Sequence, residues 1–171
     1  MNRGIIVLFA LMVSQHAHAD NVRLHGTLVA DPCVLQPGDE NVSLEFGPVM
    51  NRDLYSQQRT RGKAFNIHLA ECDLSLGKTV KISFSGIENP YLKGLLAIDA
   101  GSQASGIAIG IETQAGKALP LNTAGSEYPL DSGSNVLTML AYVQGEPDAI
   151  ASQTIEPGPF NAIATFNLEY E

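Results

Sequence analysis

Two short stretches of the sequence contain the residue types of a catalytic or phosphate-binding site. Ser75-Leu76-Gly77-Lys78 fits the S-x-x-K pattern of a serine nucleophile paired with a lysine. That chemistry needs the serine on a helix, whereas this tetrapeptide lies between two expected strands and is predicted to be a turn. The stretch Gly110–Lys117 is close to a phosphate-binding loop, but its spacing is one residue too long and Ala118 replaces the magnesium-binding hydroxyl. A hairpin turn at Ala115-Gly116 explains it better, so we expect no enzyme.

The histidines do not form a metal-binding pattern. His16 and His18 fall in an expected leader peptide, while His25 and His68 fall in different expected strands. No pair of His or Cys residues has the spacing of a zinc site. We therefore expect neither a metal nor another cofactor.

The two cysteines, Cys33 and Cys72, are expected to form a disulfide. An even number of cysteines is typical of a disulfide framework in a chain that enters an oxidising compartment. Two inert buried thiols and a reactive nucleophile are the alternatives.

The N-terminal stretch Met1–Ala19 has the organisation of a secretory signal peptide. Arg3 lies in a short basic start, Ile5–Val13 is apolar, and Ala17-His18-Ala19 fits an A-x-A cleavage site. The apolar run is too short to span a bilayer, so no retained membrane anchor is expected. Cleavage after Ala19 would leave 152 residues, the size of one domain.

The composition restricts the partners of this domain. The formal net charge is −8 and the isoelectric point is about 4.9. Nucleic-acid binding requires a basic patch, so nucleic acid is not an expected partner.

Most of the chain after residue 20 alternates apolar and polar residues with a period of two, which predicts half-buried strands. The expected strands are 22–30, 42–46, 65–69, 80–84, 107–111, 119–121, 137–143 and 160–170. Gly, Pro and Asn separate them, and this spacing predicts one all-β sandwich of about seven or eight strands. The polar stretch Asn51–Arg61 is predicted to be a loop, and no helix is expected.

Both ends of the expected domain are amphipathic strands. An apolar sheet edge is usually protected by charge, proline or a bulge, but the last strand carries only Glu169 and Glu171. If the sandwich lacks a strand beside residues 160–170, a groove opens there. Another chain would then fill it through main-chain hydrogen bonds and side-chain pockets spaced two residues apart.

The sequence from residue 20 onward resembles the pilus subunits of the chaperone–usher class, in particular the non-adhesin subunits of type 1 and P pili. The two cysteines match the disulfide between the first two strands of that family, and FNIHLAEC at 65–72 looks like its second strand. Gly26 matches the glycine of the family's donor extension. Gly158, fourteen residues from the end, and the penultimate Tyr170 match its C-terminal signature.

This resemblance implies an incomplete immunoglobulin-like sandwich that lacks its last strand. Residues 20–31 would be a donor extension and residues 32–171 the pilin domain. A periplasmic chaperone would lend a strand and bind the terminal carboxylate, and at an outer-membrane usher the extension of a neighbouring subunit would replace it. The expected donor residues are Val22, Leu24, Gly26, Leu28 and Ala30, and the expected groove edge is Gly158, Ala164, Phe166, Leu168 and Tyr170.

By this resemblance the chain would pass through the periplasm and lie in a fimbrium on the cell surface, where it would support adhesion. An adhesin is not expected, because 152 residues leave no room for a receptor-binding domain. Shaft, adaptor, tip and terminator roles stay open. The alternative from another class is a self-contained secreted β-sandwich that binds carbohydrate or protein.

Overall fold

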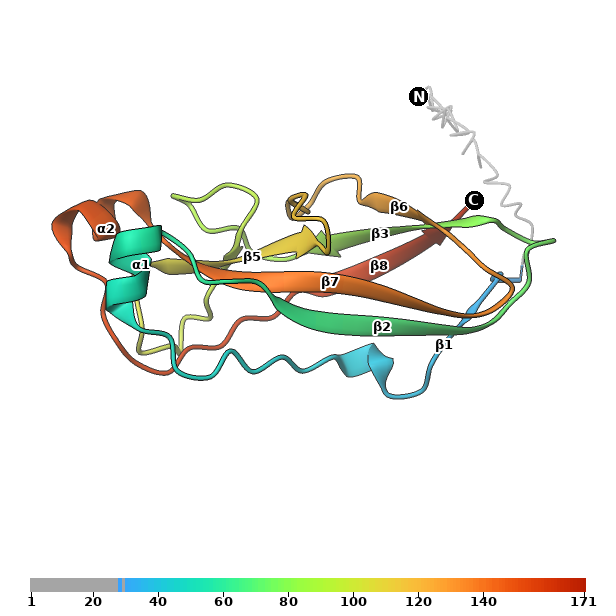
Figure 1. The fold of residues 1–171 in the computed structure, drawn as a ribbon, viewed down its shortest axis with the longest axis horizontal. Helices are drawn as coiled ribbons and strands as arrows, with labels where there is room; N and C mark the ends of the chain where they lie inside the picture. The colour runs from blue at the N-terminus through green and yellow to red at the C-terminus, as the bar shows by residue number, and fades with distance from the viewer. Residues whose placement is uncertain (1–27, 29) are drawn as a thin grey trace, which may run out of the picture.

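Figure 1 shows the fold in a computed structural model that describes residue 28 and residues 30–171. The expected signal peptide and most of the expected donor extension lie outside these residues. The elements in chain order are β1 (Val34–Leu35), a 3-10 turn (Asp39–Asn41), α1 (Asn51–Gln57), β2 (Lys63–Cys72), β3 (Thr79–Ser85), β4 (Leu96–Ala97), β5 (Ile107–Thr113), β6 (Ser126–Pro129), β7 (Gly133–Gly145), α2 (Pro147–Ser152) and β8 (Thr165–Tyr170).

These strands form two antiparallel sheets that enclose one core. The larger sheet has the order β1-β2-β7-β5-β4, and the smaller one has the order β6-β3-β8. The long strand β7 is central, because it pairs with β2 through Ile67↔Leu137 and with β5 through Ile111↔Ala141. In Figure 1 the long strands lie lengthwise, with α1 and α2 at one end and β1 at the other.

The alternation in the sequence produces the core as expected. In β3, Val80, Ile82 and Phe84 are buried while the residues between them are only partly covered. Each such apolar side chain contributes about 1.5–3 kcal/mol when it leaves water. The predicted strands at 65–69, 80–84, 107–111 and 137–143 are therefore confirmed, as parts of longer strands.

The expected loop at Asn51–Arg61 is wrong, because α1 forms there. A seven-residue helix is marginal alone, so tertiary contacts must stabilise it. Leu54 is fully buried, and the Asn51 side chain donates a hydrogen bond to the Ile155 carbonyl at 3.0 Å. The second helix, α2, was also unexpected, and it begins with a proline at its first turn. Within the described residues, no helix is long and apolar enough to cross a membrane.

Two of the predicted strands are not strands. Residues 42–46 have no ladder partner among the described residues, although Leu44 and Phe46 still pack partly against the core. Residues 119–121 form a loop whose Leu119 and Leu121 are buried. The predicted final strand is a strand only over Thr165–Tyr170, because residues 99–103 take up backbone hydrogen bonds of the stretch before it, including Asp99 N–H to the Asn161 carbonyl at 2.7 Å.

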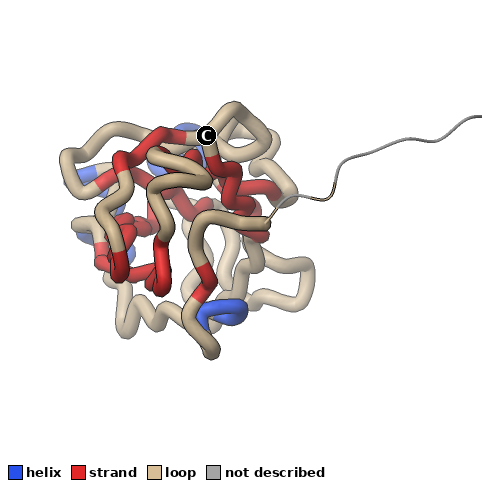
Figure 2. The backbone as a smooth tube through the Cα atoms, turned by 90° about the vertical axis from the view of Figure 1, so that its right-hand side faces the viewer, coloured by secondary structure: helices blue, strands red, loops and turns tan. Residues whose placement is uncertain are grey.

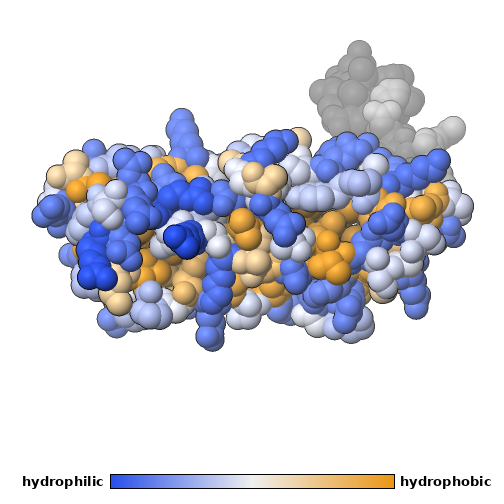
Figure 3. Space-filling model, viewed as in Figure 1, coloured by the Kyte–Doolittle hydropathy of each residue, from blue (hydrophilic) through white to orange (hydrophobic). Residues whose placement is uncertain are grey.

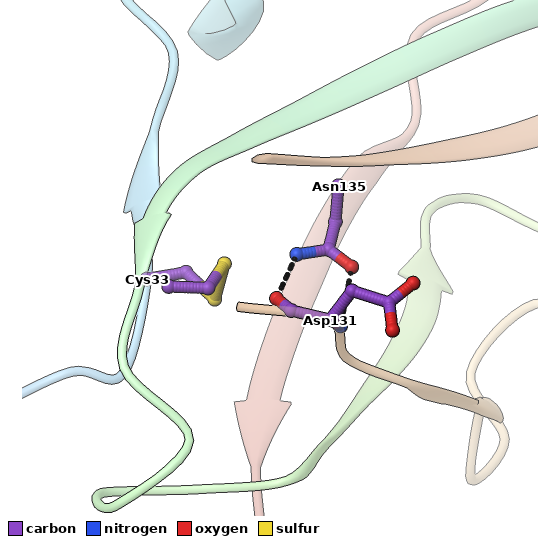
Figure 4. Close-up of a disulfide and its surroundings, with 4 residues drawn as sticks. Cys33, Asp131 and Asn135 are labelled. Atoms are coloured by element: carbon purple, nitrogen blue, oxygen red, sulfur yellow. Dashed lines mark hydrogen bonds between the residues drawn. A yellow bond between two sulfur atoms is a disulfide. The ribbon is translucent and has the colours of Figure 1, made fainter. Parts of the chain in front are cut away.

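The disulfide closes one end of the sandwich, which we call the sealed end and define by Pro32, Cys33, Cys72, Gly77 and Glu171. Cys33 and Cys72 are bonded and both buried, which confirms the expected disulfide. Figure 4 shows the turn beside it, where the Asn135 side chain makes two 2.8 Å hydrogen bonds with the backbone of Asp131. The C-terminus lies at this end, which faces the viewer in Figure 2.

Candidate functional site: the groove beside the last strand

The last strand, β8, lies at the edge of the smaller sheet. It pairs with β3 in a register that runs from Val80↔Tyr170 to Ser85↔Thr165. No strand in the described part of the chain pairs with its other side. Its inward residues, Phe166, Leu168 and Tyr170, are only half-buried, in contrast to the buried inward residues of β3. The strand therefore presents both unpaired backbone groups and incompletely covered apolar side chains.

A groove of about 690 Å³ lies along the segment that leads into this strand. One wall comes from residues 40–46 and the other from residues 160–166, while inward residues of both sheets form the floor. The lining residues are Glu40, Asn41, Val42, Ser43, Leu44, Phe46, Phe65, Phe84, Leu96, Asp99, Ile109, Ile111, Ala141, Phe160, Asn161, Ala162, Ile163, Ala164 and Phe166. The groove thus reaches into the core of the sandwich.

Phenylalanine is concentrated in this groove. Five of the six phenylalanines of the chain line it, and the sixth lies in the expected signal peptide. Phe65 and Phe84 meet edge to face at the floor, with ring centroids 6.2 Å apart. Phe46 and Phe160 come from opposite walls, and their centroids lie 6.0 Å apart. An aromatic groove with a volume of this size is typical of a site that binds apolar side chains.

The wall at residues 40–46 is held to β2 by Asp39. Its carboxylate accepts hydrogen bonds from the His68 backbone N–H and lies 2.8 Å from the His68 ring Nδ1. The backbone N–H of His68, and then its side chain, hold the pKa of Asp39 below its usual range. Lys63 of β2 also donates a hydrogen bond to the Glu45 carbonyl, so polar contacts hold this wall, which pairs with no strand among the described residues.

The floor of the groove is supported from the outer face of the larger sheet. Arg59 binds Glu112 of β5 in a bidentate ion pair, with N–O distances of 2.7 and 3.0 Å. The guanidinium lies 3.6 Å from the ring centroid of Tyr142. The hydrogen bond to Glu112 raises the pKa of Arg59, and burial raises the pKa of Tyr142. Ile111, which lines the groove, precedes Glu112 in β5, so the ion pair lies directly behind the floor on the opposite face of the sheet.

The expected groove-edge residues lie in three settings. Ala164 and Phe166 line the groove. Leu168 and Tyr170 continue the same face of β8 toward the sealed end, where burial raises the pKa of Tyr170. Gly158 does not line the groove: a Cβ there would lie 2.7 Å from Cβ of Gln103, so its role here is close backbone packing.

The expected donor residues are described only in part. Leu28 is fully exposed and Ala30 is also exposed, so neither packs onto its own domain. Val22, Leu24 and Gly26 lie outside the described residues. Their role as donors stays a prediction.

Ala164 and Phe166 are the lining residues that the sequence analysis named for the groove, and it did not assign the phenylalanines Phe46, Phe65, Phe84 and Phe160 to it. They come from four segments that are far apart in the chain, so no local motif connects them. Their residue type and their apolar positions in the expected strands were the available signals.

The stretches that resemble catalytic motifs are turns. Ser75 follows Asp73, whose carboxylate accepts the Ser75 N–H at 2.9 Å. Gly116 lies in the predicted hairpin, with its N–H bonded to the Thr113 carbonyl. Over residue 28 and residues 30–171, no group of three or more His, Cys, Asp or Glu side chains could hold a metal ion.

Comparison with known proteins identifies the family. The family model described as Fimbrial protein matches residues 22–171. The Fimbria A protein of Serratia marcescens is 34% identical over 88% of this chain and 83% of its own length. The Fimbrial adapter PapK of Escherichia coli is 30% identical over 98% of this chain and 97% of its own length.

A solved structure shows the same architecture. A chaperone–usher pilus structure, described for the molecular basis of rod uncoiling, superposes with a TM-score of 0.70 at 26% identity. The match covers 95% of this chain and 100% of the pilus chain. The expected fold, an incomplete immunoglobulin-like sandwich, is confirmed, and these relatives are fimbrial subunits, not enzymes. This chain belongs to the fimbrial protein family and is a subunit of the chaperone–usher pilus class.

Proposed function

We propose that this chain is a structural fimbrial subunit that polymerises by donor-strand exchange and supports cell adhesion. Its groove takes up a strand from another chain, and its own residues 20–31 fill the groove of a neighbour. Residues 32–171 form the pilin domain, and Met1–Ala19 direct the chain into the periplasm.

The observation that carries this proposal is the position of the groove beside the free side of β8. An added strand would pair its backbone with β8 and place alternate side chains over Phe84 and Phe166. Burying those side chains would stabilise both chains, since each large apolar side chain contributes about 1.5–3 kcal/mol.

The order in which partners would bind follows from the tendency of an open apolar groove to aggregate. Exposed core residues beside an unpaired edge promote aggregation, so a periplasmic chaperone would cover the groove first. At the outer-membrane usher, the extension of the next subunit would replace the chaperone strand. In the extension, Gly26 would let the donor backbone approach the groove closely, because glycine has no Cβ.

The test is to give the domain a strand within its own chain. Residues 20–31 are moved behind Glu171 through a flexible linker, and thermal unfolding is compared with the unmoved chain of residues 20–171. Linking the strand raises its effective concentration to the millimolar range, so that only the fit to the groove matters. We expect the rearranged chain to unfold at a temperature at least about 10 °C higher, since several kcal/mol are gained.

The control is the same rearranged chain with Leu24→Asp and Leu28→Asp, which keeps the length but cannot fill apolar pockets. It should unfold at the same temperature as the unmoved chain. Equal stability of all three forms would indicate a self-contained sandwich and would contradict the proposal.

A further inference from the structure

We propose that an exposed isoleucine pair beside the groove, Ile87 and Ile163, is a docking surface for the folded domain of a second copy of this chain. The residue that fits this surface is Leu76, which lies next to the point where the extension leaves the domain. The inference rests on the proposed function, because the two domains meet only when a strand joins them. It adds a contact outside the groove, between one folded domain and the next.

The outer face of the smaller sheet is polar along most of its length. Three cross-strand pairs of β3 and β8 lie on it, namely Lys81↔Glu169, Ser83↔Asn167 and Ser85↔Thr165. Extending this register by two residues along each segment brings Ile87 opposite Ile163. The segments approach closely here, because a Cβ at Gly86 would lie 3.5 Å from the carbonyl oxygen of Ile163. The polar face therefore ends in two neighbouring isoleucines.

Both isoleucines are open to solvent, and the backbone at Ile87 is held in place. Ile87 is 80% exposed and Ile163 is 76% exposed. The Ile87 carbonyl accepts a hydrogen bond from the Ala97 N–H at 2.8 Å. The Asn122 side chain bonds to the N–H and the carbonyl of the preceding Gly86, at 3.2 and 3.1 Å. Isoleucine also has few rotamers, so a partner that covers this pair restricts little motion.

The isoleucine pair is too small to hold a partner by itself. Two isoleucines and one facing side chain would bury on the order of a few hundred Å², whereas stable protein interfaces bury about 1,200–2,000 Å². The partner must therefore be held by a second contact nearby. The groove provides that contact, since Ile163 lines it and the pair lies at its rim. The partner is thus the chain whose strand occupies the groove.

The folded domain of that chain must lie directly at the end of the groove. Ala30 is the last expected donor residue, and Asp31 alone separates it from Pro32. Pro32 is buried, and its Cγ would lie 2.7 Å from a Cβ at Gly77. Its carbonyl accepts the Asp73 N–H at 2.8 Å. The extension therefore passes within one residue, about 3.3 Å of strand, into a fixed part of its own domain.

Leu76 is an exposed apolar residue beside this exit. It lies in the turn between β2 and β3, immediately before Gly77, and it is 54% exposed. Its backbone N–H bonds to the Asp73 carbonyl at 3.1 Å, so the turn has a defined shape. A domain that follows its own extension to a groove therefore brings Leu76 to the mouth of that groove.

The second domain has room at one end of the acceptor. Residues 160–166 line the groove, whereas none of residues 167–171 does. At the sealed end, Pro32 leads into the acceptor's own extension, and Glu171 pairs with Thr79, so the acceptor's own chain occupies that end. The opposite end, which we call the open end, carries Ile87 and Ile163. Leu76 of the second copy can pack across the isoleucine pair there.

The test uses a dimer in which each copy has one role. The acceptor is the chain of residues 20–171 with Leu24→Asp and Leu28→Asp, so that it cannot donate a strand. The donor is the chain of residues 20–171 with a second copy of residues 20–31 linked behind Glu171, which fills its own groove. A peptide of residues 20–31 replaces the donor in a parallel measurement. The rate of dissociation from the acceptor is measured for donor and peptide in the same moderate concentration of urea.

We expect the donor to dissociate about three- to tenfold more slowly than the peptide, because additional apolar burial mainly slows dissociation. Leu76→Ser in the donor, or Ile87→Ser in the acceptor, should remove most of this difference. The two substitutions together should have no larger effect than one of them, because they remove the same contact. Ile87 does not line the groove, so Ile87→Ser should leave the dissociation rate of the peptide unchanged.

The matched controls are the same substitutions in the other copy. Ile87→Ser in the donor and Leu76→Ser in the acceptor change side chains that lie away from the proposed contact. Both variants should dissociate at the rate of the unsubstituted dimer.

The outcomes separate the inference from the proposed function. If neither the donor nor the peptide binds the acceptor, the proposed function fails, and the inference fails with it. If both bind and dissociate at the same rate, or if a substitution has the same effect in either copy, the groove takes up strands without this domain contact, and the inference alone is overturned. Additive effects of Leu76→Ser and Ile87→Ser would also overturn it, since residues in contact are energetically coupled.

Discussion

The two ends of β8 lie in different surroundings, although both belong to one short strand. At the sealed end, Glu171 pairs with Thr79 through backbone hydrogen bonds, and the Cys33–Cys72 disulfide lies in the buried core. At the other end, Phe166 lines the groove, and the segment before it has no strand beside it among the described residues.

The difference between the two ends does not come from composition, because the open end is also rich in apolar residues. The groove contains five phenylalanines, and its walls continue the alternation of the strands. What it lacks is a backbone to pair with. On the face shown in Figure 3, apolar patches lie between polar side chains. Ile163, which lines the groove, is 76% exposed. Over the residues that the structure describes, the sandwich is thus completed at the sealed end and not at the open end.

The largest expected effect comes from breaking the sealed end. Cys33→Ser with Cys72→Ser removes a cross-link between residues 39 apart in the chain. The unfolding free energy should fall by about 4 kcal/mol on the chain-entropy account. Urea unfolding of the rearranged single-chain form measures it, with reduction of the unmutated protein as the control. An unchanged midpoint would show that the disulfide does not hold this end together.

The next effect comes from closing the open end to a donor. Phe166→Asp removes an aromatic ring from the groove and places a carboxylate there. Strand uptake should weaken by about 3 kcal/mol, roughly a hundredfold, because apolar contacts are lost and a charge is desolvated. Peptide titration measures it. Asn167→Asp, the next residue, which is exposed, is the matched control and should bind normally. An equal loss of affinity in both variants would show that the added charge on β8, and not the groove, causes the weaker strand uptake.

A smaller effect should follow from loosening the floor of the groove. Glu112→Gln removes the charge of the bidentate pair while keeping the size of the side chain. We expect the free energy of unfolding to fall by about 1–2 kcal/mol. This is less than for a fully buried ion pair, because 37% of the Arg59 side chain is exposed. Amide exchange should accelerate in β5 and not at the disulfide. Glu127→Gln, an exposed residue of β6, serves as the control. Faster amide exchange both in β5 and at the disulfide in the Glu112→Gln variant would contradict a local role of the ion pair.

The smallest effect concerns the wall at residues 40–46. Asp39 has a folded-state pKa below its ordinary value of 3.8, so its contribution to stability is present above that value. The contribution is lost as the pH falls from about 4 through the lower folded pKa. The backbone amide signal of His68 should report this loss in an NMR titration. Asp39→Asn should remove the transition, and its persistence in that variant would assign it to another carboxylate.

The local pattern predicted much of the fold. Period-two alternation located β2, β3, β5 and β7, because a strand buried on one face imposes that pattern directly on the sequence. The sequence also predicted the disulfide, because a chain with two cysteines can form one intramolecular pair. The helix α1 escaped prediction because Leu54 and Asn51 stabilise it through contacts with distant parts of the chain.

The candidate site divides in the same way. The sequence by itself determined that Ala164 and Phe166 share one face of the last strand, since neighbouring side chains on a strand must alternate. Only the tertiary structure decided that Phe46, Phe65 and Phe84 meet them in one groove and that Gly158 packs elsewhere, against Gln103. The reason is physical: alternation is a property of a few adjacent residues, whereas a groove exists only where separate strands are brought together and one position beside them is left unfilled.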